Sequence, residues 1–247
     1  MSLARLASLF ASAALLAGCG GSGKPVRHSE PPKSRVGSAA AAAIVIPAGS
    51  GHLAAMAPRD GLTLRDRPNG RVIAHLNPQT DYGSPTVVWA AARRGRWLGV
   101  VAASLKNSRI GWLNLAHDHP RLFRSPLELV ADVSKRKLEL RRGGRTIRTI
   151  TVTVGSRATP TPTGRFAVTD KLIPRPGSGY GCCILALSGH QPKLRPGWAG
   201  GDRIAIHGSS TQLVGRAASA GCLRAQDRDL RALMKAVPLG TPVVIRA

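Results

Sequence analysis

Two short segments, His207-Gly208-Ser209-Ser210 and Ser219-Ala220-Gly221-Cys222-Leu223-Arg224, are the most informative part of this 247-residue chain. They place one imidazole and one thiol 15 residues apart, each beside a glycine. A cysteine nucleophile needs a base that takes its proton, and small neighbours that let a carbonyl carbon reach the sulfur. Gly221 also permits a tight turn, which would let backbone N–H groups around Cys222 face a developing oxyanion. The pattern predicts a cysteine acyl-transfer site with His207 as the base.

This frame resembles the L,D-transpeptidase catalytic domain family, which carries a histidine–glycine pair, a spacer and then serine-x-glycine-cysteine-hydrophobic-arginine. The resemblance covers roughly residues 125–247. Further matching segments follow in the family's chain order: Val154-Gly155, Thr159-Pro160-Thr161-Pro162-Thr163-Gly164-Arg165-Phe166, Ile204-Ala205-Ile206-His207-Gly208 and Gly240-Thr241-Pro242-Val243-Val244-Ile245. Ala220 departs from the histidine that many members carry at that position.

The resemblance implies a role for each residue of the two segments. Cys222 is the nucleophile and His207 the base, and the carbonyl of Gly208 accepts a hydrogen bond from the imidazole. Asp202 is the one nearby carboxylate that could orient the ring instead. Arg224 is expected to bind a substrate carboxylate, for which a guanidinium group is well suited.

Three residues before the thiol are expected to orient the cysteine loop and its oxyanion-binding N–H groups. These are Ser219, Ala220 and Gly221. For Ser219 a simple turn-forming role is the alternative, because serine hydroxyls often bond to nearby backbone groups.

The implied reaction is acyl transfer on peptidoglycan stem peptides. Cys222 would attack the amide between the diamino acid and the terminal D-alanine of a tetrapeptide stem. An amine of a neighbouring stem would resolve the thioester and form a cross-link between third residues, with no cofactor. Water as the acceptor would make an L,D-carboxypeptidase, and a lipoprotein amine would make an anchoring enzyme. A non-catalytic wall-binding lipoprotein is the alternative from another class.

The cysteine count leaves the state of one pair open. If Cys19 is set aside, Cys182, Cys183 and Cys222 remain, and an odd count leaves at least one thiol unpaired. Structural burial and a redox role are both open for the adjacent pair. A zinc site from the three cysteines, His190 and His207 lacks the paired short spacings of structural sites, so we expect no metal.

The N-terminus predicts export. A short n-region, Met1 to Arg5, precedes an apolar run from Leu6 to Ala17, which is too short to span a bilayer. The run ends in Leu16-Ala17-Gly18-Cys19, which resembles a bacterial lipobox. We expect a lipoprotein signal peptide over 1–18, then a lipidated Cys19 and a flexible linker over 19–52. The protein would act at the outer face of the cytoplasmic membrane or in the cell wall.

The charge is strongly positive. There are 36 Lys and Arg against 12 Asp and Glu, a formal net charge of +24. Such an excess favours anionic partners, here cell-wall polymers or a membrane lipid surface. No nucleic-acid-binding motif accompanies it, so nucleic acid is not an expected partner. We expect a monomer.

Residues 53–118 predict a small β domain. Short β-like runs, among them Leu62–Arg65, Val72–Leu76 and Trp97–Val101, are separated by turn signals. The segment resembles, more weakly, the bacterial SH3-like barrel. Its three tryptophans favour core positions over sugar stacking. Since the chemical motifs all lie after residue 150, we expect this domain to be dispensable for the reaction.

Residues 125–247 predict the catalytic domain. Strand candidates lie at 127–133, 137–141 and 146–154, and a loop-rich stretch from Pro174 to Asp202 follows. Leu230, Leu233, Met234 and Val237 recur at helical spacing after Asp227, a candidate N-cap. The predicted fold is therefore mostly β: a small SH3-like barrel, then a β-rich L,D-transpeptidase domain with a C-terminal helix.

Overall fold

The computed structural model describes residues 51–194, 201–209 and 214–247. These residues belong to one compact unit, which extends over 41–247. The predicted signal peptide, Cys19 and nearly all of the predicted linker lie outside the described residues. Within those described, no helix has the length and apolar character needed to cross a membrane.

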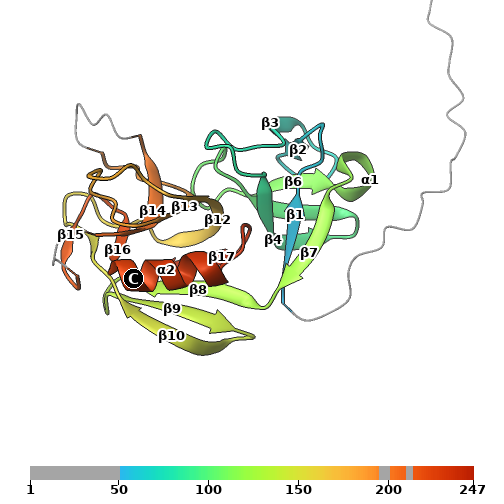
Figure 1. Cartoon of the computed structure of the whole chain (residues 1–247). Helices are drawn as coiled ribbons and strands as arrows, with labels where there is room; N and C mark the ends of the chain where they lie inside the picture. The colour runs from blue at the N-terminus through green and yellow to red at the C-terminus, as the bar shows by residue number, and fades with distance from the viewer. Residues whose placement is uncertain (1–50, 195–200, 210–213) are drawn as a thin grey trace, which may run out of the picture. The chain divides into compact units, whose positions relative to one another are not determined.

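The N-terminal part of the described chain forms a seven-stranded sheet in the order β3-β2-β6-β5-β4-β1-β7 (Figure 1). Its strands are β1 (His52–Met56), β2 (Leu62–Arg65), β3 (Val72–Leu76), β4 (Val87–Arg94), β5 (Trp97–Val101), β6 (Gly111–Asn114) and β7 (Arg121–Ser125). A one-turn helix, α1 (Leu115–Asp118), follows β6. The sheet runs antiparallel throughout, and β7 pairs with β1 along five residues. Its assignment to the SH3-like class stays a prediction.

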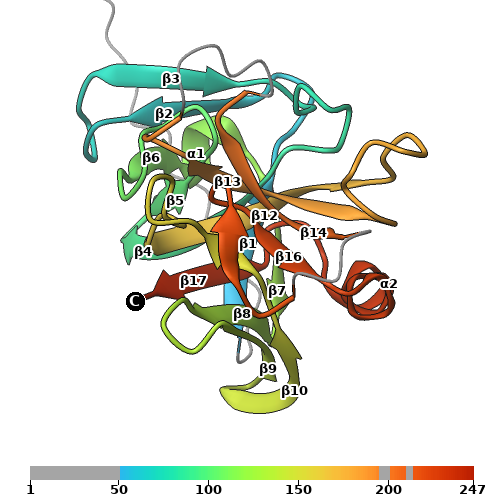
Figure 2. The ribbon, with the colours of Figure 1, turned by 90° about the vertical axis from the view of Figure 1, so that its left-hand side faces the viewer.

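The C-terminal part forms an eight-stranded mixed sheet in the order β10-β9-β8-β17-β12-β13-β14-β16. Its strands are β8 (Leu127–Asp132), β9 (Lys137–Arg142), β10 (Arg145–Thr151), β12 (Gly164–Leu172), β13 (Ile184–His190), β14 (Arg203–Gly208), β16 (Leu223–Ala225) and β17 (Pro242–Arg246). The hairpin of β9 and β10 ends one edge of the sheet (Figure 2), and β16 ends the other.

A separate pair of short parallel strands lies beside the end of this sheet. It joins β11 (Val154–Gly155) to β15 (Ala217–Ser219), with Val154 opposite Ala217 and Gly155 opposite Ser219. Because β15 leads directly into the segment that contains Cys222, this pairing fixes where that segment begins.

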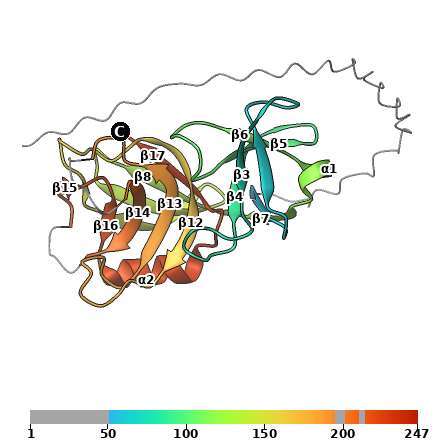
Figure 3. The ribbon, with the colours of Figure 1, turned by 90° about the horizontal axis from the view of Figure 1, so that it is seen from above.

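One helix covers the C-terminal sheet. α2 (Asp227–Ala236) lies against β13 and β14 (Figure 3). Leu230, Leu233 and Val237 recur every three or four residues, so they share one face of the helix, and all three are fully buried in the core. Apolar residues of the sheet strands fill the rest of that core.

The structure confirms the predicted mostly β fold with a helix near the C-terminus. Two details differ from the prediction. Asp227 is the first residue of α2, and Gln226 is its N-cap. The negative charge of Asp227 therefore lies in the first turn, where it interacts favourably with the positive end of the helix dipole. The stretch predicted to be loop-rich contains β13, whose residues from Leu185 to Gly189 are buried between two neighbouring strands.

The tryptophans of the N-terminal sheet are core residues. Trp89, Trp97 and Trp112 are each less than a tenth exposed. The guanidinium groups of two arginines stack over tryptophan rings: Arg94 over Trp112 and Arg165 over Trp89. The sequence-based preference for core positions over sugar stacking is confirmed.

Candidate active site

Two adjacent parallel strands bring the imidazole and the thiol together. In the register of β14 and β16, Ile206 pairs with Leu223 and His207 pairs with Arg224. Cys222 immediately precedes β16, and therefore lies level with Ala205, two residues before the histidine. Parallel strands lie about 4.8 Å apart, and side chains two positions apart point to the same face of a sheet. Cys222 and His207 therefore lie on the same face of neighbouring strands, offset by two residues.

His207 is held rigidly in one orientation. Its side chain is 3% exposed, and Nδ1 lies 2.6 Å from the carbonyl oxygen of Gly208. If Nδ1 carries the proton that it donates to this oxygen, Nε2 is left unprotonated and can act as a base. The ring of Tyr180 packs edge-on against the imidazole, with 4.9 Å between the centroids.

Asp202 does not orient His207. Its carboxylate lies 2.9 Å from Nδ1 of His190, on the preceding strand β13. The acceptor for His207 is the backbone of Gly208. Among the described residues, the imidazole therefore has no carboxylate partner that would favour its protonated form.

The surroundings of His207 favour its neutral form. Burial lowers its pKa from 6.5 to about 4, and the positive charge of Arg224 acts in the same direction. The carbonyl groups of Gly208 and Tyr180 act in the opposite direction without compensating. At neutral pH the imidazole is therefore uncharged.

The surroundings of Cys222 favour the thiol. Burial raises its pKa above the ordinary value of 9.0, whereas the backbone N–H of Ala205 and the charge of Arg224 lower it. The residue as a whole is only partly buried, because some of its surface remains open to solvent. Both shifts favour the uncharged forms, a thiol and a neutral imidazole.

Ser219 shapes the turn before the thiol. Its hydroxyl donates to the carbonyl oxygen of Cys222 at 2.6 Å and accepts from the N–H of Gly221 at 3.0 Å. The side chain is buried. Its own carbonyl oxygen accepts from the N–H of Ser156 at 2.9 Å and the hydroxyl of Thr159 at 3.0 Å. Ser219 thus ties the loop both to itself and to the segment after β11.

Gly221 has the conformational role expected of it, but its N–H is already engaged. Its φ of +119° lies in a region that side chains rarely adopt. Because the N–H donates to Ser219, it is not free to bind an oxyanion as the sequence suggested.

Gln191 holds the same loop from the other side, and sequence reasoning missed it. Its Nε2 donates to the carbonyl oxygens of Pro160, at 2.9 Å, and Ala220, at 3.1 Å. Gln191 is 4% exposed, and a Cβ at Gly221 would lie 2.1 Å from that Nε2. Nothing near Gln191 in the sequence marks it, because both acceptors are about thirty residues away.

Arg224 faces both the catalytic pair and a cavity. Its charge lowers the pKa of both His207 and Cys222, so the guanidinium lies near both. Its Nε is buried and has no hydrogen-bond partner among the described residues. Arg224 also lines a cavity of about 230 Å³, together with Ser156, Thr159, Leu194, Ala218, Ser219 and Ala220.

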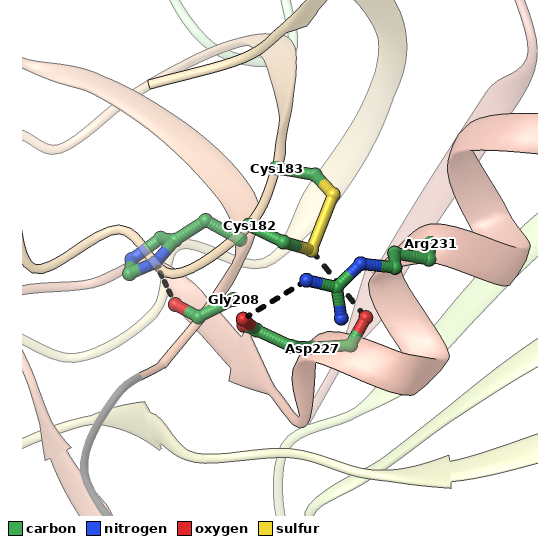
Figure 4. Close-up of a disulfide and its surroundings, with 6 residues drawn as sticks. Cys182, Cys183, Gly208, Asp227 and Arg231 are labelled. Atoms are coloured by element: carbon green, nitrogen blue, oxygen red, sulfur yellow. Dashed lines mark hydrogen bonds and ion pairs between the residues drawn. A yellow bond between two sulfur atoms is a disulfide. The ribbon is translucent and has the colours of Figure 1, made fainter. Parts of the chain in front are cut away.

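The two adjacent cysteines form a disulfide close to this site (Figure 4). Sγ of Cys182 lies 3.4 Å from the carbonyl oxygen of Asp227, at the start of α2. The carbonyl of Cys183 accepts from the N–H of Gly208 at 3.0 Å. Cys222 is the free cysteine of the described chain. The disulfide answers the pairing question that the sequence left open.

A metal centre finds no support in the described part of the chain. No three or more His, Cys, Asp or Glu side chains gather there in positions that could hold an ion. The five residues considered for zinc have other partners or roles. Cys182 and Cys183 form the disulfide, and His190 lies against Asp202. His207 and Cys222 are the candidate base and nucleophile.

Residues 126–245 match the family model of the L,D-transpeptidase catalytic domain. Among curated proteins, the chain is 31% identical over 121 residues to YkuD of Bacillus licheniformis, which is named as a candidate L,D-transpeptidase. That match covers 49% of this chain and 66% of the relative, slightly under two thirds of its length. YkuD of Bacillus subtilis, named in the same way, is 29% identical over 127 residues, covering 51% of this chain and 70% of the relative.

Solved structures give matches in the same group. An Enterococcus faecium L,D-transpeptidase mutant matches with 19% identity and a TM-score of 0.38, over 51% of this chain and 56% of that chain. An L,D-transpeptidase from Mycobacterium smegmatis matches with 17% identity and a TM-score of 0.40, over 79% of this chain and 82% of that chain. The family-model match shows that residues 126–245 are similar to the L,D-transpeptidase catalytic domain family.

Proposed function

We propose that the protein is a peptidoglycan L,D-transpeptidase that forms cross-links between stem-peptide third residues through a thioester on Cys222. The observation that carries this proposal is the register of β14 and β16, which pairs His207 with Arg224 and puts Cys222 two residues before Arg224 on the neighbouring strand. The match of residues 126–245 to the family model supports peptidoglycan as the substrate class.

Attack begins from the neutral pair. As Sγ of Cys222 approaches the amide carbonyl between the diamino acid and D-alanine, its proton passes to Nε2 of His207. The backbone N–H of Ala205, which lowers the pKa of Cys222, stabilises the negative charge that develops on sulfur. The carbonyl of Gly208 stabilises the imidazolium through Nδ1. His207 then protonates the departing amine of D-alanine, which leaves a thioester.

The N–H of Cys222 is the candidate donor to the tetrahedral oxyanion. The Ser219 hydroxyl fixes the peptide groups on both sides of it. One such preorganised donor is typically worth about 3 kcal/mol in the transition state. Ser219, Ala220 and Gly221 therefore act by orienting this turn, and none of them needs to touch the substrate.

Arg224 is proposed to hold a carboxylate of the stem peptide. Its buried Nε is unpaired among the described residues, and an unpaired buried donor is costly unless a ligand satisfies it. The cavity beside it is polar at Ser156, Thr159 and Ser219 and is large enough for a side chain or a short peptide segment. No cofactor takes part in the reaction.

The location of the protein is part of the proposal. Cleavage before Cys19 and lipidation there would anchor the enzyme at the outer face of the cytoplasmic membrane, and the linker up to residue 52 would let it reach the wall. Its net charge of +24 would hold it to anionic cell-wall polymers or the lipid surface. We propose that it acts as a monomer.

Product analysis tests the reaction. The protein is incubated with disaccharide-tetrapeptide, and the products are separated and weighed by mass spectrometry, with Cys222→Ala as the control. Dimers that have lost one D-alanine support transpeptidation. Tripeptide alone would make the protein an L,D-carboxypeptidase, and transfer to a lipoprotein amine would make it an anchoring enzyme. No product from the wild type, or equal product from Cys222→Ala, would leave only a wall-binding role.

A further inference from the structure

Side chains join the N-terminal part of the described chain to the catalytic domain at several places, and three of these contacts matter to the argument that follows. The ring of Trp89 carries the Arg165 guanidinium at 4.6 Å from its centroid, and Trp89 packs with Ala167 in one apolar cluster. Thr80 donates to the buried carboxylate of Asp170. Asn107 bonds to His190. Of these contacts, the one made by Asn107 lies next in sequence to Gln191, whose side chain bonds to the cysteine loop.

Asn107 engages both polar groups of the His190 backbone. Its Nδ2 donates to the carbonyl oxygen of His190 at 2.6 Å, and its Oδ1 accepts from the N–H of the same residue at 2.8 Å. The His190 ring adds a contact of 2.6 Å from Nε2 to the carbonyl oxygen of Ala103. The amide thus replaces the neighbouring strand that this end of β13 lacks on one side. It fixes the end of β13 in position and orientation.

The next residue along the chain is Gln191, which holds the cysteine loop. Its backbone N–H donates to Asp202 at 2.7 Å, and its Oε1 accepts from the N–H of Lys193 at 3.0 Å. Its Nε2 reaches Pro160 and Ala220. Since the amide is buried and satisfied at both ends, a shift of its backbone has to break a bond or carry the loop with it.

We propose that Asn107 is a positioning residue for the nucleophile, acting through His190 and Gln191 on the carbonyl of Ala220, two residues before Cys222. The inference rests on the proposed function in that Cys222 is taken as the nucleophile. It conflicts with the sequence-based expectation that residues 53–118 are dispensable for the reaction, which stays a prediction. The N-terminal sheet supplies one support of the active-site loop, although none of its residues touches the reacting atoms.

The size of the expected effect follows from how sharply acyl transfer depends on geometry. A misplacement of about 1 Å between reacting atoms can lower a rate by about 10²-fold. Loss of one remote support allows a smaller average displacement, so we expect Asn107→Ala to lower the acylation rate constant by about 10-fold. Noncovalent affinity for the acylating ligand should fall less than the rate constant, because Ser156, Thr159 and Leu194 of the cavity beside Arg224 lie outside the loop that is released.

The test compares three single variants of the full chain. Asn107→Ala removes the support, Asn107→Asp keeps the acceptor for the His190 N–H but loses the donor, and Arg165→Ala removes an interdomain contact that does not lead to Gln191. For each variant we would measure the melting temperature, the acylation rate constant and affinity with a carbapenem, and hydrogen exchange of amides 219–223.

The proposal predicts slower acylation and faster exchange at 219–223 in Asn107→Ala, intermediate values in Asn107→Asp and wild-type values in Arg165→Ala. If Asn107→Ala fails to fold, Asn107→Asp is compared with the wild type and with Arg165→Ala by the same measurements. In a Gln191→Ala background, Asn107→Ala should have almost no further effect on the rate, because both changes release the same loop.

The proposal is overturned if Asn107→Ala lowers only the melting temperature, if Arg165→Ala changes exchange at 219–223 equally, or if the Asn107 and Gln191 effects add. A wild-type protein that never acylates would refute the proposed function instead. Hydrogen exchange at 219–223 would still decide whether Asn107 supports the loop.

Discussion

At the scale of the residue, the fold changes the chemistry of His207 through burial. The imidazole packs against the Tyr180 ring, and its Nδ1 lies 2.6 Å from the backbone carbonyl oxygen of Gly208. Burial lowers its pKa to about 4 and raises that of Cys222. In the proposed reaction, these shifts favour deprotonation of Cys222 during attack on the substrate over a thiolate that exists beforehand.

The depressed pKa of His207 predicts an unusual pH dependence of acylation. A base that titrates near 6.5 would lose half its activity near that pH. With a pKa of about 4, His207 stays unprotonated, and the acylation rate constant should remain nearly level from pH 8 to pH 5 and fall only below it. Stopped-flow acylation by a carbapenem across this range measures the profile. A midpoint between pH 6 and 7 would contradict the assigned environment of the base.

The same shift predicts a stability cost in acid. Because the folded pKa lies below the unfolded value of 6.5, the unfolded chain binds the extra proton, and stability falls as the pH decreases from 6.5 toward 4. The contribution lost between pH 7 and 4.5 is about 2 kcal/mol. Urea unfolding of the wild type and His207→Asn at both pH values should show a smaller acid loss in the variant. Equal losses would mean that His207 is not buried in its neutral form.

At the scale of the element, the site depends on how short segments far apart in the sequence are joined. β11 pairs with β15, β14 pairs with β16, and Gln191 after β13 bridges Pro160 and Ala220. Together they hold the cysteine loop from three sides. The disulfide of Cys182 and Cys183 fixes the start of β13, beside Gly208 and the first turn of α2 (Figure 4).

The disulfide predicts a simple thiol count. In the folded protein without reductant, Cys222 should be the one residue of the catalytic domain that a maleimide labels, because the other two cysteines are paired. Within the catalytic domain, labelling of Cys222→Ala should be negligible until a dithiol is added, and then Cys182 and Cys183 should both react. Labelling is followed by digestion and mass mapping. Modified Cys182 or Cys183 in the unreduced variant would show that the pair is free.

Sequence reasoning reached the parts of this site that are local. His207 and Gly208 are adjacent, and the turn from Ser219 to Cys222 is contained within four residues, so their arrangement could be inferred from the motif. Gln191 and Asn107 could not be found, because their partners lie 29 and 83 positions away and depend on how the sheets are assembled. β13 was missed for a related reason: glycine and proline around it hid a strand that tertiary packing stabilises.

At the scale of the whole molecule, charge and the N-terminal sheet bear on where and how the domain works. Basic residues outnumber acidic ones three to one across the chain. The N-terminal sheet contacts the catalytic sheet through Trp89, Thr80 and Asn107, so the two parts share bonds that a flexible tether would not provide. We expect them to unfold in a single cooperative transition.

Membrane attachment is the prediction that belongs to this scale. Cys19→Ala should move the exported protein from the membrane pellet to the soluble fraction, because lipid on that residue is the expected anchor. The fractions are compared after washes at low and high salt, since the basic surface can hold the protein to anionic lipid electrostatically. A variant that stays in the pellet after the high-salt wash would mean that residues 6–17 remain as an anchor.

Trapping the intermediate decides whether Cys222 carries the acyl group. The full chain is mixed with disaccharide-tetrapeptide, quenched in acid within seconds, digested and mapped by mass spectrometry. We expect a disaccharide-tripeptide adduct on the peptide that contains Cys222, released by hydroxylamine as a thioester should be, and absent in Cys222→Ala. An adduct that persists in Cys222→Ala, or that maps to another residue, would contradict it.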